Sequence, residues 1–305
     1  MKKVRIILTA VFFLWIAAYF ISFGFDDDSE IISNGIAIVP IKGVISPEDS
    51  NDILRGSGMG SDTIINNLKR AGDNDGIKAI VLEINSPGGT VVSSREVANY
   101  VKSLSGKKPV VAWIREMGAS GAYWIASGAD VIVADEMSIT GSIGVLSSYL
   151  EFSGLLEKYG VRYERLVAGE LKDVGSPYRD LSETEKRLMN VKLKKIQDLF
   201  VKDVAENRKL NEAQVNEIKS GFFYLGIEAK DLGLVDVLGG REEAIAKAKE
   251  LAGIEDGKVV EYKTKKSILE LIEKFTNKAF FNIGRGIGLS LFDNEIENRL
   301  EIMAL

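Results

Sequence analysis

Short apolar runs alternate with amphipathic segments through the first half of the chain. Runs that are rich in β-branched residues and bounded by turn residues predict strands over 36–46, 77–84, 109–114 and 130–135. Helical spacing of apolar residues predicts helices over 63–71 and 93–104 and a short helix after Ser120. This alternation predicts right-handed crossovers and a mostly parallel sheet, so the expected fold class is α/β. Pro40 favours an edge position for the first strand, because proline lacks an amide donor.

The pattern changes after residue 136. Further strands are predicted over 138–150 and 161–167, with a short helix over 155–160 between them. One long helical pattern then starts at Ser182, and Glu185 three residues later completes a capping box. The apolar stripe of this helix consists of Leu188, Val191, Leu193, Ile196, Leu199, Phe200 and Val204. We expect the stripe to dock on the sheet or on a neighbouring subunit. Two more amphipathic helices are predicted over 243–253 and 267–275.

The N-terminus carries an uncharged apolar run over residues 6–25, with Lys2, Lys3 and Arg5 before it and three aspartates after it. Its length just suffices to span a bilayer as a helix. The basic flank predicts a cytoplasmic N-terminus and an extracytoplasmic remainder. A cleaved signal peptide is the competing interpretation, but the run exceeds a typical h-region and lacks a clear A-x-A site. We therefore predict a signal anchor over residues 1–28.

Composition excludes several classes of function. The net charge of −5 and the dispersed lysines leave no basic surface for nucleic acid. The 305 residues include no cysteine, which removes disulfides, thiolate catalysis and cysteine-bound metals. They also include no histidine, so the usual zinc and non-haem iron sites lose their main ligand. We expect neither a metal nor a cofactor.

Two turns follow consecutive predicted strands, NSPGG at 85–89 and GAS at 118–120. Ligands bind at this carboxyl edge in open α/β sheets. Gly88 and Gly89 would let the backbone approach a ligand closely. A plain strand-to-helix turn explains Pro87 and one glycine but leaves the second glycine without a role.

Ser120 lies where a helix begins, and a helix-capping serine is the commoner object at such a position. Its neighbours Gly118, Ala119, Gly121 and Ala122 leave space around the hydroxyl, which a cap does not need. A nucleophile at a strand-to-helix turn does need that space. A serine nucleophile also requires a base, and without histidine the best remaining base is a lysine held neutral.

Lys172, in the loop GELKDVGSPYRD, is the best candidate for that base. One more solvated lysine is the competing interpretation. Glu170 and Asp173 flank it, and a carboxylate close to a lysine amine favours the protonated form. Asp173 must therefore point away, with Arg179 as the expected partner.

Five motifs, in this order and spacing, resemble the signal peptide peptidase SppA family in its short form: INSPGG, ASGAYWIAS, TGSIGV, GELKDVGSPYRD and LGLVDVLGG. The resemblance runs from about Ile36 to Gly253. It implies a ClpP/crotonase-type fold of repeated ββα units with an added helical segment, and a membrane-anchored serine peptidase with a Ser/Lys dyad. The implied peptidase domain covers 29–256, and the tail 257–305 has no assigned role.

The resemblance also implies roles for individual residues. Ser120 is the nucleophile, Lys172 the general base and Ser142 the residue that orients the lysine, while the amides of Gly89 and Gly121 form the oxyanion hole. A substrate strand would lie against Gly88, Thr90, Val91, Ile143, Gly144 and Val145. The common SGGYY reads SGAYW here, and Trp124 is the departure that alters packing beside the specificity pocket.

The expected function is extracytoplasmic hydrolysis of cleaved signal peptides and other small or unfolded chains. Family members assemble into rings or domes in which subunits share the catalytic groove, so a homo-oligomer is expected. Two arrangements of the dyad stay open: Lys172 serves the Ser120 of its own chain, or that of a neighbouring subunit. Two alternatives stay open: a crotonase-like acyl-CoA enzyme, and a membrane scaffold without catalysis.

Overall fold

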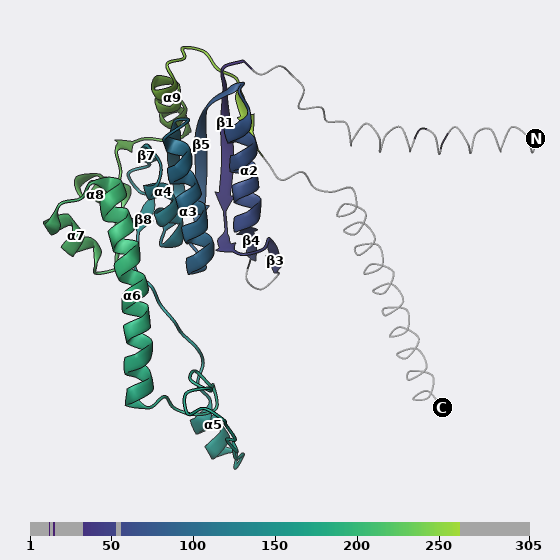
Figure 1. The fold of residues 1–305 in the computed structure, drawn as a ribbon, viewed down its shortest axis with the longest axis vertical. Coiled ribbons are helices and arrows are strands. Elements are labelled where there is room, and N and C mark those ends of the chain that lie inside the picture. Colours follow the sequence, from purple (N-terminus) through teal and green to yellow (C-terminus); the bar gives the residue numbers. More distant parts are fainter. Residues whose placement is uncertain (1–11, 13–14, 16–32, 53–55, 263–305) are drawn as a thin grey trace, which may run out of the picture. The chain divides into compact units, whose positions relative to one another are not determined.

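A parallel sheet forms the centre of the fold in the computed structural model, which describes residues 12, 15, 33–52 and 56–262 (Figure 1). All neighbouring pairs along the main path of six strands in this sheet are parallel. In spatial order its strands are β10 (Val237–Leu238), β7 (Val131–Ala134), β6 (Val110–Ala119), β5 (Ile77–Ser86), β1 (Gly35–Lys42) and β11 (Val259–Glu261). The predicted α/β class is confirmed.

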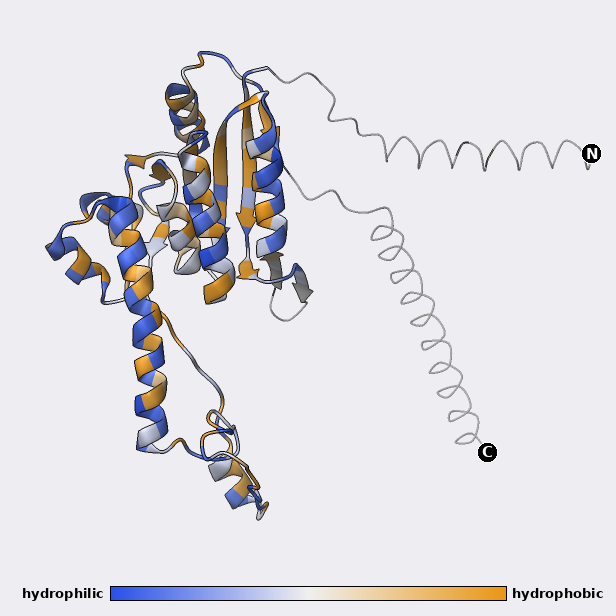
Figure 2. Ribbon diagram, in the orientation of Figure 1, coloured by the Kyte–Doolittle hydropathy of each residue, from blue (hydrophilic) through white to orange (hydrophobic). Residues whose placement is uncertain are grey.

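Helices cover both faces of the sheet. On one face lie α2 (Ser61–Asp73), α3 (Val91–Ser105) and α4 (Gly121–Ser127), and on the other lies α9 (Arg241–Ala252). Successive side chains of a strand point to opposite faces, so Ile80, Leu82 and Ile84 of β5 join the first core while Ala79 and Val81 join the second. Because both faces are buried, the central strands are mostly apolar (Figure 2).

Short strands hold the turns after β5 and β6. At the end of β6, β8 (Ile139–Gly141) pairs in parallel with Met117 to Ala119 and antiparallel with β9 (Phe223–Leu225). A small second sheet consists of β2 (Val44–Ser46), β4 (Gly56–Gly60) and β3 (Ser50–Asp52). A single bridge joins Ile45 of β2 to Gly89 in the turn after β5. These pairings fix the glycine-rich turns at the carboxyl edge of the sheet.

The long helix α6 (Glu183–Arg208) begins at the predicted capping box, in which Ser182 and Glu185 each accept a hydrogen bond from the other's amide. Its C-terminal half packs into the core through Phe200, Val201 and Val204, and α7 (Glu212–Ile218) and α8 (Gly226–Asp231) follow it. Its N-terminal half and α5 (Ser153–Lys158) lie away from the sheet (Figure 1). We name residues 145–199 the arm.

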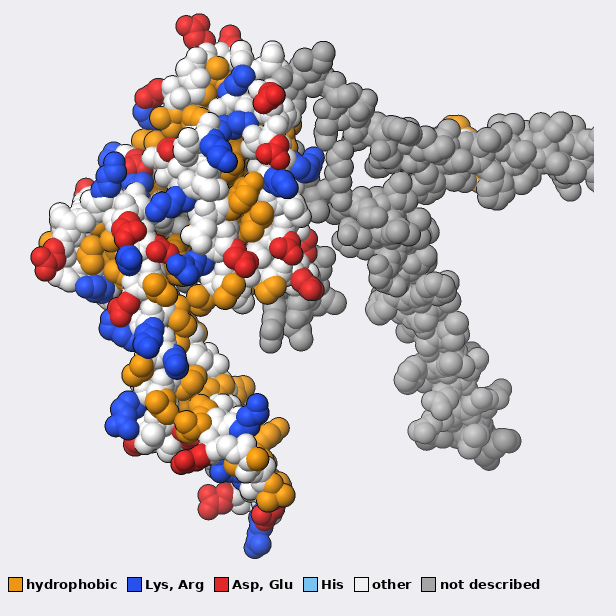
Figure 3. All heavy atoms as spheres, viewed as in Figure 1, with side chains coloured by type: hydrophobic (Ala, Val, Ile, Leu, Met, Phe, Trp, Pro, Cys, Tyr) orange, Lys and Arg blue, Asp and Glu red, His pale blue; other side chains and the backbone are white. Residues whose placement is uncertain are grey.

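The arm carries most of the exposed large apolar side chains of the described residues. They are Leu146, Tyr149, Leu150, Phe152, Leu155, Tyr159, Val161, Tyr163, Leu166, Val167, Leu171, Tyr178, Leu188, Val191 and Leu199. Figure 3 shows apolar side chains grouped over α6 and the segment beside it. Exposed apolar area of this extent is typical of a surface that contacts another molecule.

Three predicted strands differ from the structure. β1 is interior rather than at the edge, but β11 pairs only with Ile36 to Ile38, so Pro40 lies beyond that partner. Residues 161–167 form no strand, because no strand among the described residues lies beside the arm to pair with them. The strand predicted over 138–150 ends at Gly141, where that residue and Ser142 adopt positive φ and turn the chain.

The ends of the chain differ in how far the structure describes them. β11 belongs to the sheet and Tyr262 to the core, so the domain continues beyond the predicted end at residue 256. The remaining tail 263–305, with the helix predicted over 267–275, lies outside the described residues. So does the predicted anchor, except Phe12 and Trp15, which are helical. Within the ranges that the structure describes, no helix is both long and apolar enough to cross a membrane.

Candidate active site

Ser120 forms the sharp turn from β6 into α4, with φ 53° and ψ −126°. A non-glycine residue in so sparsely populated a region costs about 1–3 kcal/mol and persists only where its surroundings hold it. Its amide donates to the Gly141 carbonyl at 2.8 Å, and its carbonyl accepts from the Trp124 amide at 3.0 Å. The Ser120 hydroxyl makes no capping hydrogen bond, so the helix-cap interpretation is wrong. The strained turn presents this hydroxyl as a nucleophile elbow does.

Glycines surround this hydroxyl because side chains would not fit. Gly88 has φ +97°, and a β-carbon there would lie 2.6 Å from the Gly121 nitrogen. A β-carbon on Gly121 would lie 3.3 Å from the Gly89 nitrogen, so these two amides are neighbours. Neither amide has an acceptor within the described residues, since the bridge to Ile45 uses the carbonyl of Gly88 and the amide of Thr90. Two free amides beside a serine hydroxyl have the geometry that an oxyanion hole requires.

Ser142 is placed by the same pairing that holds Ser120. It follows Gly141, whose carbonyl accepts from the Ser120 amide. Its own amide donates to the Phe222 carbonyl at 3.0 Å, and its φ of 50° directs the chain away from the sheet. The side chain of Ser142 is half-buried and faces the same groove as Ser120.

A groove of about 1000 Å³ joins these residues. Its lining consists of Val44, Pro87, Gly88, Gly89, Val91, Ser94, Ser120, Gly121, Trp124, Ser142, Gly144, Val145, Leu146, Asn190, Leu193, Lys194, Gln197, Phe200, Ser220 and Gly221. Two residues predicted to bind substrate are not part of it. The side chain of Ile143 packs into the core, and Thr90 is exposed with its amide bonded to the Ile45 carbonyl. The structure thus brings the serine, the two amides and Ser142 together.

One wall of the groove comes from α6, which the sequence did not predict to lie at the site. Trp124 of α4 stacks on Phe200 of α6, with ring centroids 4.3 Å apart. The Trp124 indole nitrogen donates to Asp203 at 3.2 Å, and Arg95 lies 3.4 Å from the same carboxylate oxygen. The apolar stripe of α6 was the available signal, but periodicity does not reveal which surface a helix covers.

Lys172 does not reach this groove in its own chain. It lies in the arm, its side chain is exposed, and its amide donates to the Gly169 carbonyl at 3.0 Å. Its amine forms no hydrogen bond or ion pair with any residue that the structure describes. The predicted base and the predicted nucleophile are therefore apart within one chain.

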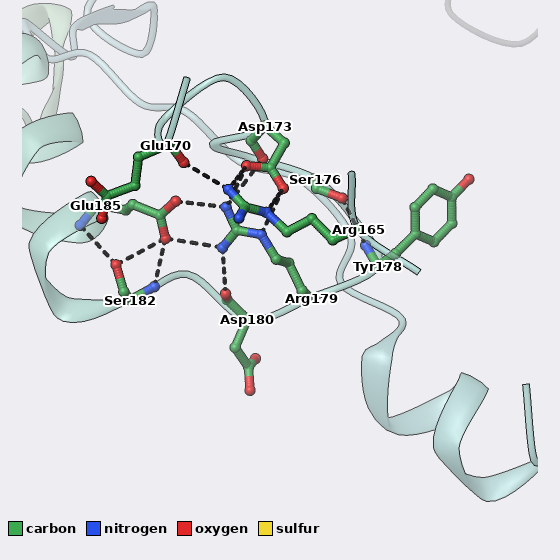
Figure 4. A network of polar contacts seen from close by, with 9 residues as sticks. All are labelled: Arg165, Glu170, Asp173, Ser176, Tyr178, Arg179, Asp180, Ser182 and Glu185. Carbon is green, nitrogen blue, oxygen red and sulfur yellow. Dashed lines mark hydrogen bonds and ion pairs between the residues drawn. The ribbon is translucent and has the colours of Figure 1, made fainter. Parts of the chain in front are cut away.

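A cluster of four charged side chains surrounds the Lys172 loop (Figure 4). Asp173 pairs with Arg179, as predicted, at 2.9 Å, and also with Arg165 at 2.7 Å. Arg179 extends to Glu185 of α6 at 2.6 Å. Hydrogen bonds from Arg165 and Arg179 hold the pKa of the Asp173 carboxyl well below its usual range. The Arg179 guanidinium, with the Ser182 amide, lowers the pKa of Glu185 to about 2.

Comparison with known proteins gives consistent similarities. The model of peptidase family S49 matches residues 102–255. A Methanocaldococcus jannaschii protein named as a protease is 38% identical over 243 residues, which are 79% of this chain and 77% of that protein. An Enterococcus faecium protein named as signal peptide peptidase SppA is 35% identical over 231 residues, 75% of this chain and 67% of that protein. Protease 4 of Haemophilus influenzae is 34% identical over 72% of this chain but only 35% of that protein.

Proposed function

This chain belongs to peptidase family S49, among the SppA proteins, and is a serine peptidase, for which we propose Ser120 as the nucleophile and Lys172 as the general base. One observation carries the proposal: a strained turn leaves the Ser120 hydroxyl free beside the free amides of Gly89 and Gly121. A serine that only capped α4 would need neither the strain nor two unsatisfied amides.

The proposed reaction follows from these positions. The substrate peptide lies in the groove, and the Ser120 oxygen attacks its carbonyl carbon while the neutral amine of Lys172 accepts the hydroxyl proton. The amides of Gly89 and Gly121 hold the negative charge that develops on the carbonyl oxygen. Lys172 then gives its proton to the departing amine, and water hydrolyses the ester on Ser120. Ser142 orients the lysine amine by a hydrogen bond.

We propose that the lysine comes from a neighbouring copy of the chain. Lys172 is exposed on the arm and absent from the groove of its own chain. The arm also exposes the apolar side chains that a subunit interface would bury, Leu166 at 96% and Leu150 at 73% among them. A homo-oligomer in which each arm reaches the groove of the next copy accounts for both features. Such an assembly also agrees with the ClpP/crotonase-type fold that the resemblance implies.

Mixing two inactive variants tests the dyad and its arrangement. Ser120→Ala and Lys172→Ala should each abolish cleavage of a fluorogenic peptide by the full chain in detergent, with circular dichroism unchanged. Refolded together in equal amounts, they should regain about a quarter of the wild-type activity, because one serine and one lysine from different chains then meet at random. No regain would place the dyad within one chain, and full activity of Lys172→Ala would exclude it as the base.

The proposed substrates are cleaved signal peptides and other small or unfolded polypeptides. The apolar wall of Val91, Trp124 and Phe200 supports this choice, since apolar segments are the common feature of signal peptides. The purified chain should therefore degrade a synthetic signal peptide and leave a folded protein of similar composition intact. Equal rates on the folded protein would contradict the proposal.

The apolar run over residues 6–25 supports anchoring in the cell membrane, with the peptidase domain outside the cytoplasm. Alkaline carbonate should leave the full chain with the membrane fraction, whereas a protease added to spheroplasts should digest its peptidase domain. Release by carbonate would contradict the anchor.

The rival acyl-CoA enzyme and scaffold functions would leave the backbone strain at Ser120 without a purpose.

A further inference from the structure

Asp173 directly follows Lys172, which raises a difficulty for a lysine that acts as a base. A carboxylate close to a lysine amine pairs with it and favours its protonated form, which cannot accept a proton. In the structure the Asp173 carboxylate is engaged elsewhere. Two guanidinium groups bind it, and its side chain is only 13% exposed (Figure 4).

Both guanidinium groups bind Asp173 through two nitrogen atoms. Arg165 donates to its two oxygens from Nε and Nη2, each at 2.7 Å. Arg179 donates from Nε at 2.9 Å and from Nη2 at 3.0 Å. Bidentate pairs of this kind fix the direction of a carboxylate as well as its position. The Asp173 oxygens are thereby withheld from the neighbouring lysine.

The same two arginines contact the backbone on both sides of Lys172, and on the C-terminal side Arg179 Nη2 donates to the Asp173 carbonyl at 3.5 Å. Arg165 Nη2 also donates to the Glu170 carbonyl at 2.7 Å. Arg179 donates to both carboxylate oxygens of Glu185, at 2.6 and 3.0 Å. Glu185 is buried and accepts a hydrogen bond from the Ser182 amide at 2.8 Å. Through Arg179 and Glu185 the Lys172 loop is therefore joined to the first turn of α6. The Glu170 side chain, the other carboxylate beside Lys172, is exposed to solvent.

We propose that Arg165, Asp173, Arg179 and Glu185 are positioning residues that present Lys172 to the serine and keep the Asp173 carboxylate off its amine. The inference rests on the proposed role of Lys172 as the base. The four groups carry two positive and two negative charges. A substitution that removes one of them therefore leaves a net charge of known sign beside the Lys172 amine. A cluster that only stabilised the arm would change the melting temperature without shifting the pH dependence of catalysis.

Two substitutions of opposite charge test the proposal. Arg179→Gln releases part of the Asp173 carboxylate, so the acid limb of the pH–rate profile should move to higher pH. Asp173→Asn leaves two guanidinium groups unpaired near the amine, so the acid limb should move to lower pH. Both should lower kcat by about tenfold or more at neutral pH with KM nearly unchanged, because the base is misplaced while the groove is intact.

The control is Glu183→Gln, which breaks the exposed Lys186–Glu183 pair on the same helical turn and should leave kcat and the pH profile unchanged. If Arg179→Gln fails to fold, Arg179→Lys keeps the positive charge but loses the bidentate geometry of the guanidinium. It should give a smaller loss of kcat and move the acid limb in the same direction. Acid limbs that coincide with wild type in both folded variants would overturn the positioning role. Activity that survives Lys172→Ala would instead overturn the proposed function, so the two failures are distinguishable.

Discussion

At the scale of single residues, Ser120 and Gly121 show how backbone conformation prepares the chemistry. Ser120 adopts a φ that side chains rarely accept, and the Gly141 carbonyl and the Trp124 amide hold it there. Gly121 has no side chain, because Ser94 of α3 occupies the space that a β-carbon would take. The Ser120 hydroxyl and the Gly121 amide would act on the same substrate carbonyl. They are therefore positioned by residues of three different elements, β8, α4 and α3.

Gly121→Ala should lower kcat/KM by about a hundredfold, since displacement of one oxyanion donor costs 10²–10³ in rate. The new β-carbon would lie 2.1 Å from Ser94 Oγ and 2.8 Å from Ser94 Cβ, so the amide must move. Ser94→Gly added to Gly121→Ala removes both contacts and should restore much of the activity. Hydrolysis of a fluorogenic peptide measures each variant.

Gly106→Ala is the matched control, because a β-carbon at that position meets nothing within 4 Å and its φ is −74°. It should keep wild-type activity. A Gly121→Ala protein with undiminished kcat/KM would remove this amide from the proposed oxyanion hole.

At the scale of elements, α6 has two different halves. The C-terminal half packs on α4 and lines the groove through Phe200, and Leu193 and Lys194 of the N-terminal half extend that lining. The N-terminal half carries the Lys172 loop by way of Glu185, and its apolar residues Leu188 and Val191 are exposed. One regular helix therefore supplies the substrate wall in its own chain and supports the residue proposed to act in the next.

Local sequence predicted the elements and turns whose causes are local. These are the strands over 77–84 and 109–114, the capping box of Ser182 and the pairing of Asp173 with Arg179. In each case the residues that predict the feature lie only a few positions apart. The strand predicted over 161–167 fails, because pairing requires a neighbour that only tertiary structure supplies. Local sequence likewise could not predict that Lys172 lies outside the groove of its own chain, because this position also depends on tertiary structure.

Stability at acid pH should depend on Glu185. Its pKa is lowered from 4.5 to about 2, so its stabilising effect is complete above pH 4.5 and is lost as the pH falls towards 2. Glu185→Gln should therefore melt at a lower temperature than wild type at pH 7, and this difference should shrink markedly by about pH 3. Thermal denaturation followed by circular dichroism measures both proteins at each pH.

Glu183→Gln serves as the control here too, since an exposed pair contributes little at any pH. A melting difference between Glu185→Gln and wild type that stays constant from pH 7 to about pH 3 would show that Glu185 acts through packing rather than charge.

At the scale of the whole molecule, the groove and the arm of one chain are each incomplete. The groove of one chain holds Ser120 but not Lys172, and the lysine in its lining, Lys194, pairs with Asp198. The arm holds Lys172 beside exposed apolar side chains. A head-to-tail contact between copies would complete both at once, and such contacts close into rings when the rotation between copies allows it. Catalysis and assembly should then be lost together.

Leu166→Glu tests this coupling, because Leu166 is the most exposed of the apolar side chains on the arm. A charge buried without a partner in an interface is costly, so the variant should dissociate in analytical ultracentrifugation and lose peptidase activity in proportion. Leu251→Glu, at an exposed position on α9 outside the arm, should keep both the assembly and the activity. A Leu166→Glu protein that dissociates yet retains its activity would mean that Lys172 reaches Ser120 within one chain, by a movement of the arm towards its own groove.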